Sequence, residues 1–196
     1  MKFDPLVKSE KNCLFTIADG KKIDCENVKL LKADEGKAIS ESSVSASSSG
    51  QPAIFALSLR FEDVDMGGGN YNEELLAALR DSLKAAEESG NFFFIQAESS
   101  SEIQDADQAD SLIKAFVHAA RRIKDCQALV GFSIPEKLLE KDRGSSLGEE
   151  SWSRWFVNDM NVKHSHYVYF VQKGLGERLE LVDEIVKTDY ILYQVQ

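Results

Sequence analysis

The sequence has few cysteines and lacks the spacing patterns of a metal centre. Its 196 residues include only three cysteines, Cys13, Cys25 and Cys126. They form no C-x-x-C pair, and no cluster of cysteine and histidine has the spacing of a zinc site. The H-x-H pair at His164 and His166 has no third ligand at metal spacing, and neither has His118, so we assign all three structural or surface roles. We expect no metal and no disulfide framework.

Basic residues are also few, because 23 lysines and arginines face 33 acidic residues, for a formal net charge of -10. Such a chain repels phosphate backbones and anionic membrane surfaces. No apolar run approaches the roughly 18 residues of a membrane span, and no h-region follows the first residues. We therefore expect no nucleic acid, no membrane partner and a cytoplasmic location. A chain trimmed of its signal peptide would look the same.

Sequence motifs for nucleotide binding and for serine hydrolases are missing. Residues 67–69 are three glycines before a predicted helix, but the chain has no G-x-x-x-x-G-K-[ST], and the Rossmann fingerprint lacks its third glycine. The acidic residues Glu62, Asp63 and Asp65 just upstream would repel a phosphate. We interpret the glycines as a flexible loop. No G-x-S-x-G elbow is present, and we expect no cofactor.

Apolar runs alternate with amphipathic helical patterns from residue 52 onward. The predicted strands are 53–61, 92–98, 128–134, 167–172 and 190–195. The predicted helices are 71–89, 106–125, 150–160 and 176–187, with a short helical turn and a Gly/Ser loop over 136–149. Strands that are apolar on both faces and alternate with helices are typical of parallel sheets. We therefore predict an α/β fold with a parallel sheet of about five strands, in a partial TIM-barrel-like or a flavodoxin-like arrangement.

Two features precede this regular part of what we treat as a single α/β domain, 1–196. Residues 12–32 indicate a small N-terminal β-hairpin, because a strand at 14–17 leads through Asp19-Gly20 to a return strand at 23–31. Residues 33–51 are Ser-rich, with seven serines between positions 40 and 49. This composition is typical of a loop or linker.

Polar and acidic residues stand at the carboxyl ends of the predicted strands, where parallel α/β folds bind their ligands. Carboxylates gathered there raise each other's pKa, and a general acid can thus stay protonated near neutral pH. Glu136 and Glu98 are the candidate catalytic residues. The candidate ligand-binding residues are Glu62, Asp63, Asp65, Gln96 and Gln172. The alternative is that loops are polar in any fold.

Residues 112–136, LIKAFVHAARRIKDCQALVGFSIPE, resemble the helix and fourth strand of cellulase-like glycoside hydrolase barrels. In that family, a helix with an A-x-R-Y-K-like ending leads into V-x-G-[FY]-x-[IL] and then Asn-Glu-Pro. LLAALRDSLKAAEESGNFFFIQ is similar to the preceding helix and third strand, and LSLRF to the second strand. WFVNDMNVKHSHYVYFVQ is similar to the next helix and strand, and FTIADGKKIDCENVKLL to the N-terminal hairpin. The resemblance implies a barrel-derived fold, a carbohydrate ligand and Glu136 in the place of the acid/base glutamate.

The chain departs from this family where the family has its catalytic residues. The fourth strand ends Ile134-Pro135-Glu136 instead of Asn-Glu-Pro, and no histidine stands near Gln96 at the end of the third strand. Neither Glu180 nor Glu184 follows a strand, as the nucleophile glutamate of the family does. About 145 residues follow the Ser-rich loop, whereas a (β/α)₈ barrel typically has about 250. We therefore expect a truncated and degenerate relative of these barrels.

The sequence leaves three hypotheses about function open. The first is a non-catalytic, glycosidase-like protein that binds a partner protein or a small polar ligand such as a carbohydrate. The second is a working glycoside hydrolase with Glu136 as its acid/base, whose pKa Lys137 would lower and Glu98 would raise. The third is a flavodoxin-like regulatory or assembly module. An incomplete barrel would leave open sheet edges, so we also expect a homo-oligomer.

Overall fold

A computed structural model describes residues 5–10, 12–33, 52–143, 151–174 and 189–195. Three predicted features fall outside these residues. They are nearly all of the Ser-rich segment 33–51, the Gly/Ser loop at 144–149 and the helix at 176–187, which includes Glu180 and Glu184.

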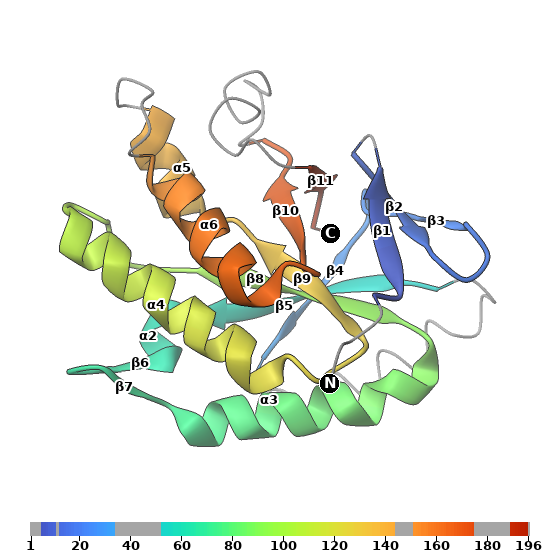
Figure 1. Ribbon diagram of the computed structural model, residues 1–196, viewed down its shortest axis with the longest axis horizontal. Helices are drawn as coiled ribbons and strands as arrows, with labels where there is room; N and C mark the ends of the chain where they lie inside the picture. The colour runs from blue at the N-terminus through green and yellow to red at the C-terminus, as the bar shows by residue number, and fades with distance from the viewer. Residues whose placement is uncertain (1–4, 11, 34–51, 144–150, 175–188, 196) are drawn as a thin grey trace.

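The centre of the fold is a sheet of six parallel strands (Figure 1). In order across the sheet they are β11 (Tyr190–Tyr193), β10 (Val168–Gln172), β9 (Leu129–Ser133), β8 (Phe92–Glu98), β5 (Ile54–Arg60) and β4 (Lys29–Lys32). All neighbouring pairs are parallel. The predicted parallel, adjacent arrangement of the strands in 53–61, 92–98, 128–134 and 167–172 is therefore confirmed. The sixth strand, β4, was expected to belong to the N-terminal hairpin.

Amphipathic helices follow the strands and cover one face of the sheet (Figure 1). They are α3 (Glu73–Ala86), which continues into the 3₁₀ turn η2 (Glu87–Ser89), α4 (Ala106–Ile123), α5 (Glu136–Arg143) and α6 (Trp152–His164). Asn72, Asp105 and Ser151 begin α3, α4 and α6, and each side chain accepts a hydrogen bond from a backbone N–H of the first turn. Within the described ranges, no helix is long and apolar enough to cross a membrane.

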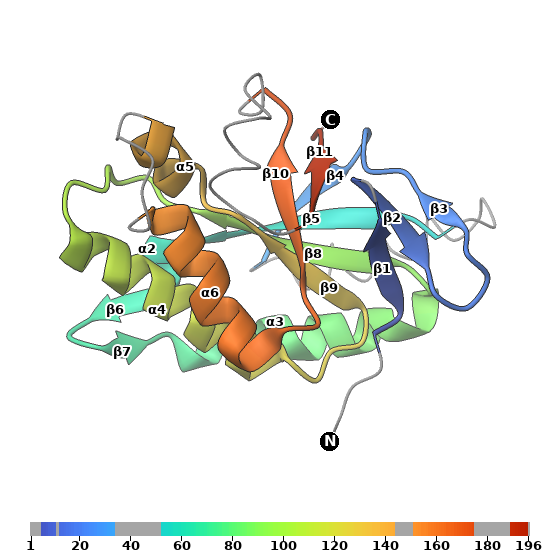
Figure 2. The same cartoon turned by 45° about the horizontal axis from the view of Figure 1, so that its top comes forward.

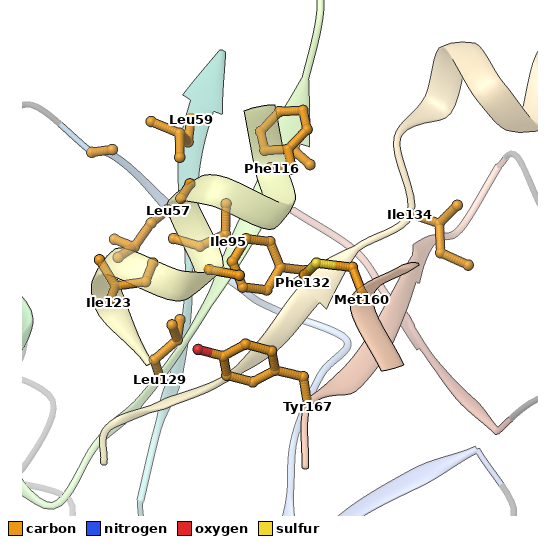
Figure 3. Packing of buried hydrophobic residues seen from close by; sticks show 14 of the residues in the cluster. Leu57, Leu59, Ile95, Phe116, Ile123, Leu129, Phe132, Ile134, Met160 and Tyr167 are labelled. Carbon is orange, nitrogen blue, oxygen red and sulfur yellow. The ribbon is translucent and has the colours of Figure 1, made fainter. Parts of the chain in front are cut away.

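The larger apolar core lies between the sheet and these helices. Figure 3 shows its central side chains, among them Leu57, Leu59, Ile95, Phe116, Phe132 and Met160, which come from β5, β8, β9, α4 and α6. All six are buried almost completely. Because burying one such side chain contributes about 1.5–3 kcal/mol, this core holds the helices on the sheet.

The opposite face of the sheet is concave and holds a second core. Its residues alternate along the strands with those of the first core, as the two-residue period of a strand requires: Ile54, Ala56, Phe92, Phe94, Val130, Val168, Phe170, Ile191 and Tyr193. The rings of Phe94 and Phe170 stack with centroids 4.1 Å apart, and the ring of Tyr193 meets Phe94 edge-on at 4.8 Å. Since β8 and β11 are separated by two strands, these contacts require a strongly curled sheet.

The two edge strands, β4 and β11, lie near one another (Figure 2), and backbone hydrogen bonds join the residues next to them. Val28 N–H donates to Gln194 O at 2.9 Å, Gln194 N–H donates to Cys25 O at 3.0 Å, and Val28 and Val195 form a parallel bridge. The strands also follow one another in chain order across the sheet, whereas a doubly wound sheet reverses its order at a switch point. The fold is therefore a partial TIM-type barrel, and the flavodoxin-like alternative is wrong.

A small antiparallel sheet covers the amino end of the concave face. It consists of β1 (Val7–Glu10), β2 (Cys13–Thr16) and β3 (Lys22–Ile23), and Val7, Leu14 and Ile23 belong to the concave core. An N-terminal hairpin is thus present. The expected return strand at 23–31 is divided, however, because its first residue pairs with β2 and its last residues form β4. The alternation of apolar and polar residues alone does not distinguish a strand of the hairpin from an edge strand of the main sheet.

The outer edge of the main sheet carries charge. Lys29 and Lys32 at the two ends of β4 are both exposed, and charged side chains on an edge strand discourage pairing with another chain. The expected homo-oligomer stays a prediction, now with less support from this edge.

The segment after β5 is more regular than the expected loop at 62–70. It contains α2 (Phe61–Val64) and a hairpin of β6 (Asp65–Gly67) and β7 (Asn70–Tyr71). Gly67, Gly68 and Gly69 all have positive φ, between 63° and 82°, a region that favours residues without a Cβ atom. The glycines therefore serve the turn of a hairpin.

Gly131 is required by the close approach of β9 and β10. It pairs with Val168, next to a register shift between β8 and β9. A Cβ atom at position 131 would lie 1.8 Å from the carbonyl oxygen of Val168 and 2.8 Å from its carbonyl carbon. Backbone atoms inside a sheet cannot move aside cheaply, so no larger residue fits here.

We predict that Gly131→Ala lowers the free energy of unfolding by about 3 kcal/mol or more, because overpacking against a rigid strand forces β9 and β10 apart. Urea denaturation followed by far-UV circular dichroism measures this change. The control is Ser111→Ala on the exposed side of α4, which should change stability by less than about 0.5 kcal/mol. Equal stability of the two variants would contradict the predicted steric role.

His164, in the last turn of α6, is buried without a hydrogen-bond partner. Its side chain is 2% exposed, and both ring nitrogens lack a partner within the described residues, as does the hydroxyl of the neighbouring Tyr167. Burial, and then the nearby His166, Lys124 and Lys163, lower the pKa of His164 to about 4. The neutral imidazole is therefore the form that the folded chain accommodates.

We predict that His164 makes the fold sensitive to acid. Its folded pKa lies below its unfolded value, so its contribution is complete above about pH 6.5 and is lost as the pH falls toward 4. His164→Phe should remove a loss on the order of 2 kcal/mol between these pH values. Urea denaturation of wild type and of His164→Phe at several pH values measures how the free energy of unfolding of each depends on pH. His118→Phe is the control, and identical slopes for wild type and His164→Phe would exclude the proposed effect.

Candidate functional site

A polar cavity of about 240 Å³ opens at the carboxyl ends of the strands. It lies where the concave face continues beyond its apolar core, because the same alternation that buries Phe94 places Gln96 and then Glu98 on this face. Its lining comprises Arg60, Gln96, Ala97, Glu98, Ser99, Ser100, Ser133, Ile134, Glu136, Lys137, Gln172 and Tyr193. The concave face is thus apolar at its amino end and polar at its carboxyl end.

Glu98 is held by two short hydrogen bonds. Ser58 Oγ donates to Glu98 Oε2 at 2.6 Å, and Gln96 Nε2 donates to Glu98 Oε1 at 2.5 Å. A carboxylate can only accept, so the amide of Gln96 must turn its NH₂ group toward Glu98. The remaining amide oxygen, Gln96 Oε1, is buried and has no partner within the described residues.

Glu136 directly follows Pro135 and opens α5 at the rim of the cavity. Its pKa is raised, first by partial burial and then by the charges of Glu140 and Glu98, while Lys137 acts in the opposite direction. The expected opposing effects of Glu98 and Lys137 are both found. The described part of the chain donates no hydrogen bond to this carboxyl group.

Tyr193 and Ser133 form the floor of the cavity, and sequence reasoning missed both. Burial raises the pKa of Tyr193, opposed by a hydrogen bond with Ser133 and supported by the charges of Glu98 and Glu136. Ser133 Oγ also accepts a hydrogen bond from Ala97 N–H at 2.9 Å. Tyr193 continues the alternation of the concave face from Ile191, and this spacing was the signal that could have identified it.

The two cations of the cavity each face carboxylates. Arg60 Nε and Nη2 donate to the two carboxylate oxygens of Asp63 at 2.8 and 2.7 Å. Lys137 Nζ donates to Glu102 at 2.6 Å and to Glu140 at 3.3 Å. Both cationic side chains of the lining are therefore paired with carboxylates.

Glu62 positions a loop at the cavity wall. Its Oε1 accepts from Ser99 Oγ at 3.0 Å, from Ser100 N–H at 2.9 Å and from Ser101 N–H at 3.2 Å. Burial raises the pKa of Glu62, but hydrogen bonds from its own backbone N–H, Ser100 and Ser99 outweigh that effect, and the net pKa is lowered. The ionised carboxylate therefore holds the wall at neutral pH.

The structure brings only some of the predicted residues together. Glu98, Glu136, Gln96 and Gln172 line the 240 Å³ cavity. Glu62 and Asp63 line a neighbouring cavity of about 530 Å³ at the ends of β4 and β5. Asp65 accepts a hydrogen bond from Gly67 N–H in the β6–β7 hairpin. In the described ranges, no three His, Cys, Asp or Glu side chains are grouped so that they could hold a metal ion.

Comparison with known proteins identifies the fold. No protein-family model and no curated protein matches the sequence. An endo-1,4-β-mannanase from Eisenia fetida matches with a TM-score of 0.65 at 11% identity, over 98% of this chain and 72% of that chain. A β-mannanase from Mytilus edulis matches with a TM-score of 0.58 at 16% identity, over 96% and 73%.

The GH5_18 protein of Bifidobacterium longum matches with a TM-score of 0.54 at 10% identity, over 77% of this chain. This chain spans only 45% of the length of that protein. At such identities the similarity shows the fold alone. The predicted resemblance to cellulase-like glycoside hydrolase barrels is confirmed at that level.

We predict that Glu62→Ala releases the cavity wall. The amides of Ser100 and Ser101 should exchange with solvent about tenfold faster, because a hydrogen bond to a charged group contributes about 1.5–3 kcal/mol. Hydrogen exchange followed by NMR measures the two amides directly. Asp63→Ala removes an equal charge from the same short helix without contacting the loop, and should leave both rates unchanged. Unchanged rates in Glu62→Ala would show that the loop is held by other contacts.

Proposed function

We propose that this chain binds a small, hydroxyl-rich ligand, a single carbohydrate unit or the end of an oligosaccharide, and does not hydrolyse it. The observation that carries the proposal is the polar cavity on the concave face, with Glu98, Glu136 and Gln172 at its wall. In barrels of this type, ligands bind at the carboxyl ends of the strands.

The similar structures support a carbohydrate as the ligand. The E140A variant of the Bifidobacterium longum GH5_18 protein was crystallised with Manβ1-4GlcNAc, and a Pseudomonas stutzeri endoglucanase was crystallised with cellobiose. Function does not follow from fold alone, so the chemistry of the cavity has to carry the argument. Its side-chain hydroxyls, amides and carboxyls are the groups that hydrogen-bond to sugar hydroxyls.

The size of the cavity favours a short ligand. About 240 Å³ lies just below the usual range of roughly 300–1,000 Å³ for small-molecule sites. Within the lining residues, Tyr193 is the only aromatic side chain, and it is buried. A long oligosaccharide would find little aromatic surface on which to stack.

The carboxyl groups are poorly arranged for turnover. Glycoside hydrolysis requires one protonated acid and a second carboxylate that is available as nucleophile or base. Glu98 is the second carboxyl group in this cavity, and both of its oxygens accept hydrogen bonds from neighbouring side chains. Pro135 also stands before Glu136 where the motif of the family, Asn-Glu-Pro, has an asparagine.

One observation favours a second candidate, a glycoside hydrolase. Partial burial, and then the charges of Glu140 and Glu98, raise the pKa of Glu136, as is required of a general acid. In this case Glu136 would protonate the leaving oxygen, and Glu98 would act on the opposite face of the sugar. A partner protein in place of the carbohydrate stays a prediction of the sequence.

We expect the wild-type chain to bind a monosaccharide or short β-linked oligosaccharide in calorimetric titrations and to release no reducing sugar. Gln172→Ala should weaken binding, and Ser111→Ala, far from the cavity, should not. Turnover that is lost in Glu136→Gln would establish the hydrolase candidate instead. Absence of binding to every sugar on a panel of hexoses and β-linked oligosaccharides would refute the proposed ligand class.

A further inference from the structure

The polar groups of the cavity are unequally used. The donors are mostly engaged: Arg60 with Asp63, Lys137 with Glu102 and Glu140, and the Ser100 N–H with Glu62. Among the acceptors, the exposed carboxyl group of Glu136 receives no hydrogen bond from the described residues. Gln96 Oε1 is buried and has no partner among them, although its side chain lines the cavity and is only 8% exposed.

We propose that the cavity selects ligands that carry a protonated amine beside their hydroxyl groups, and above all an amino sugar. The ammonium group would donate to Glu136, and a neighbouring donor of the ligand would satisfy Gln96. The inference rests on the proposed carbohydrate-binding function and specifies the chemical class of its ligand.

The charges around Glu136 favour a cation. On α5, Glu140 adds negative charge and the ammonium of Lys137 is shared between Glu102 and Glu140. On β8, Glu98 adds a second carboxylate, and on β11, Tyr193 is neutral, because burial raises its pKa. On β5, Arg60 faces Asp63. Partial burial is the first cause of the raised pKa of Glu136, followed by the charge of Glu140, the opposing charge of Lys137 and the charge of Glu98. A cationic group beside these carboxylates is stabilised.

Gln96 supplies an observation that does not depend on charge. Its orientation follows from the bond to Glu98, since an exchanged amide would turn an oxygen toward a carboxylate. A buried acceptor without a donor is costly. Gln96 is also part of the cavity lining. A hydrogen-bond donor of the ligand, either an amine or a hydroxyl group, would remove that cost if it reached this oxygen. The amide would have to shift slightly to receive it.

The test compares three sugars of one ring shape by calorimetry near neutral pH: D-glucosamine, D-glucose and N-acetyl-D-glucosamine. We expect glucosamine to bind about tenfold more tightly than the two neutral sugars, because charge-assisted hydrogen bonds are roughly twice as strong as neutral ones. If the neutral sugars bind equally or more tightly, the amine inference is wrong and the carbohydrate proposal stands. If no sugar binds, both are wrong.

Two variants locate the effect. Glu136→Gln keeps the shape of the side chain and should reduce the preference for glucosamine to about twofold or less, since only a neutral hydrogen bond remains. Glu88→Gln removes the same charge from an exposed position on η2 and should keep the full preference. A preference that survives in Glu136→Gln would overturn the assignment of the ammonium site.

The pH dependence gives a second readout. As the pH falls, Glu136 with its raised pKa gains a proton before an ordinary glutamate does. Glucosamine affinity should therefore fall with the pH in wild type, while glucose affinity changes little. Equal pH dependence for both sugars would contradict the inference.

Discussion

The curl of the parallel sheet is the constraint on which the rest of this structure depends. A parallel sheet of six strands has two faces to cover, and this chain covers only one with helices. The other face is buried against itself. Val28, just before β4, and Gln194, just after β11, are joined by a backbone hydrogen bond. This closure brings Phe94, Phe170 and Tyr193 from three strands into ring contact.

The curled sheet divides the concave face into two ends with different chemistry. At the amino end, the small sheet β1–β3 supplies Val7, Leu14 and Ile23 to the apolar core. At the carboxyl end no such cover is described, and the alternating positions become Gln96, Glu98, Ser133 and Gln172. The same two-residue period therefore builds a hydrophobic core and a polar cavity in one continuous surface.

The cavity is defined as much by paired charges as by the residues that reach it. Asp63, Glu102 and Glu140 engage Arg60 and Lys137 at the rim, and Glu62 engages the serine loop. Glu136 is left beside Glu98 without a hydrogen-bonding cation. This distribution, more than the similarity to glycoside hydrolases, sets the chemistry that the site can perform, because a shared fold supports many different functions.

The sequence by itself determined the parallel α/β class and most of the strands and helices, because continuous apolar runs and helical stripes are local patterns. It also placed Glu98, Glu136, Gln96 and Gln172 at one edge of the sheet, since residues at the carboxyl ends of parallel strands must share one edge. Only the tertiary structure decided that β4 joins the main sheet, that the sheet curls, and that Glu62 and Asp63 serve as partners of Ser100 and Arg60 instead of lining the same cavity. The contact between Tyr193 and Ser133 became visible only then, because it depends on strands that the curled sheet brings together.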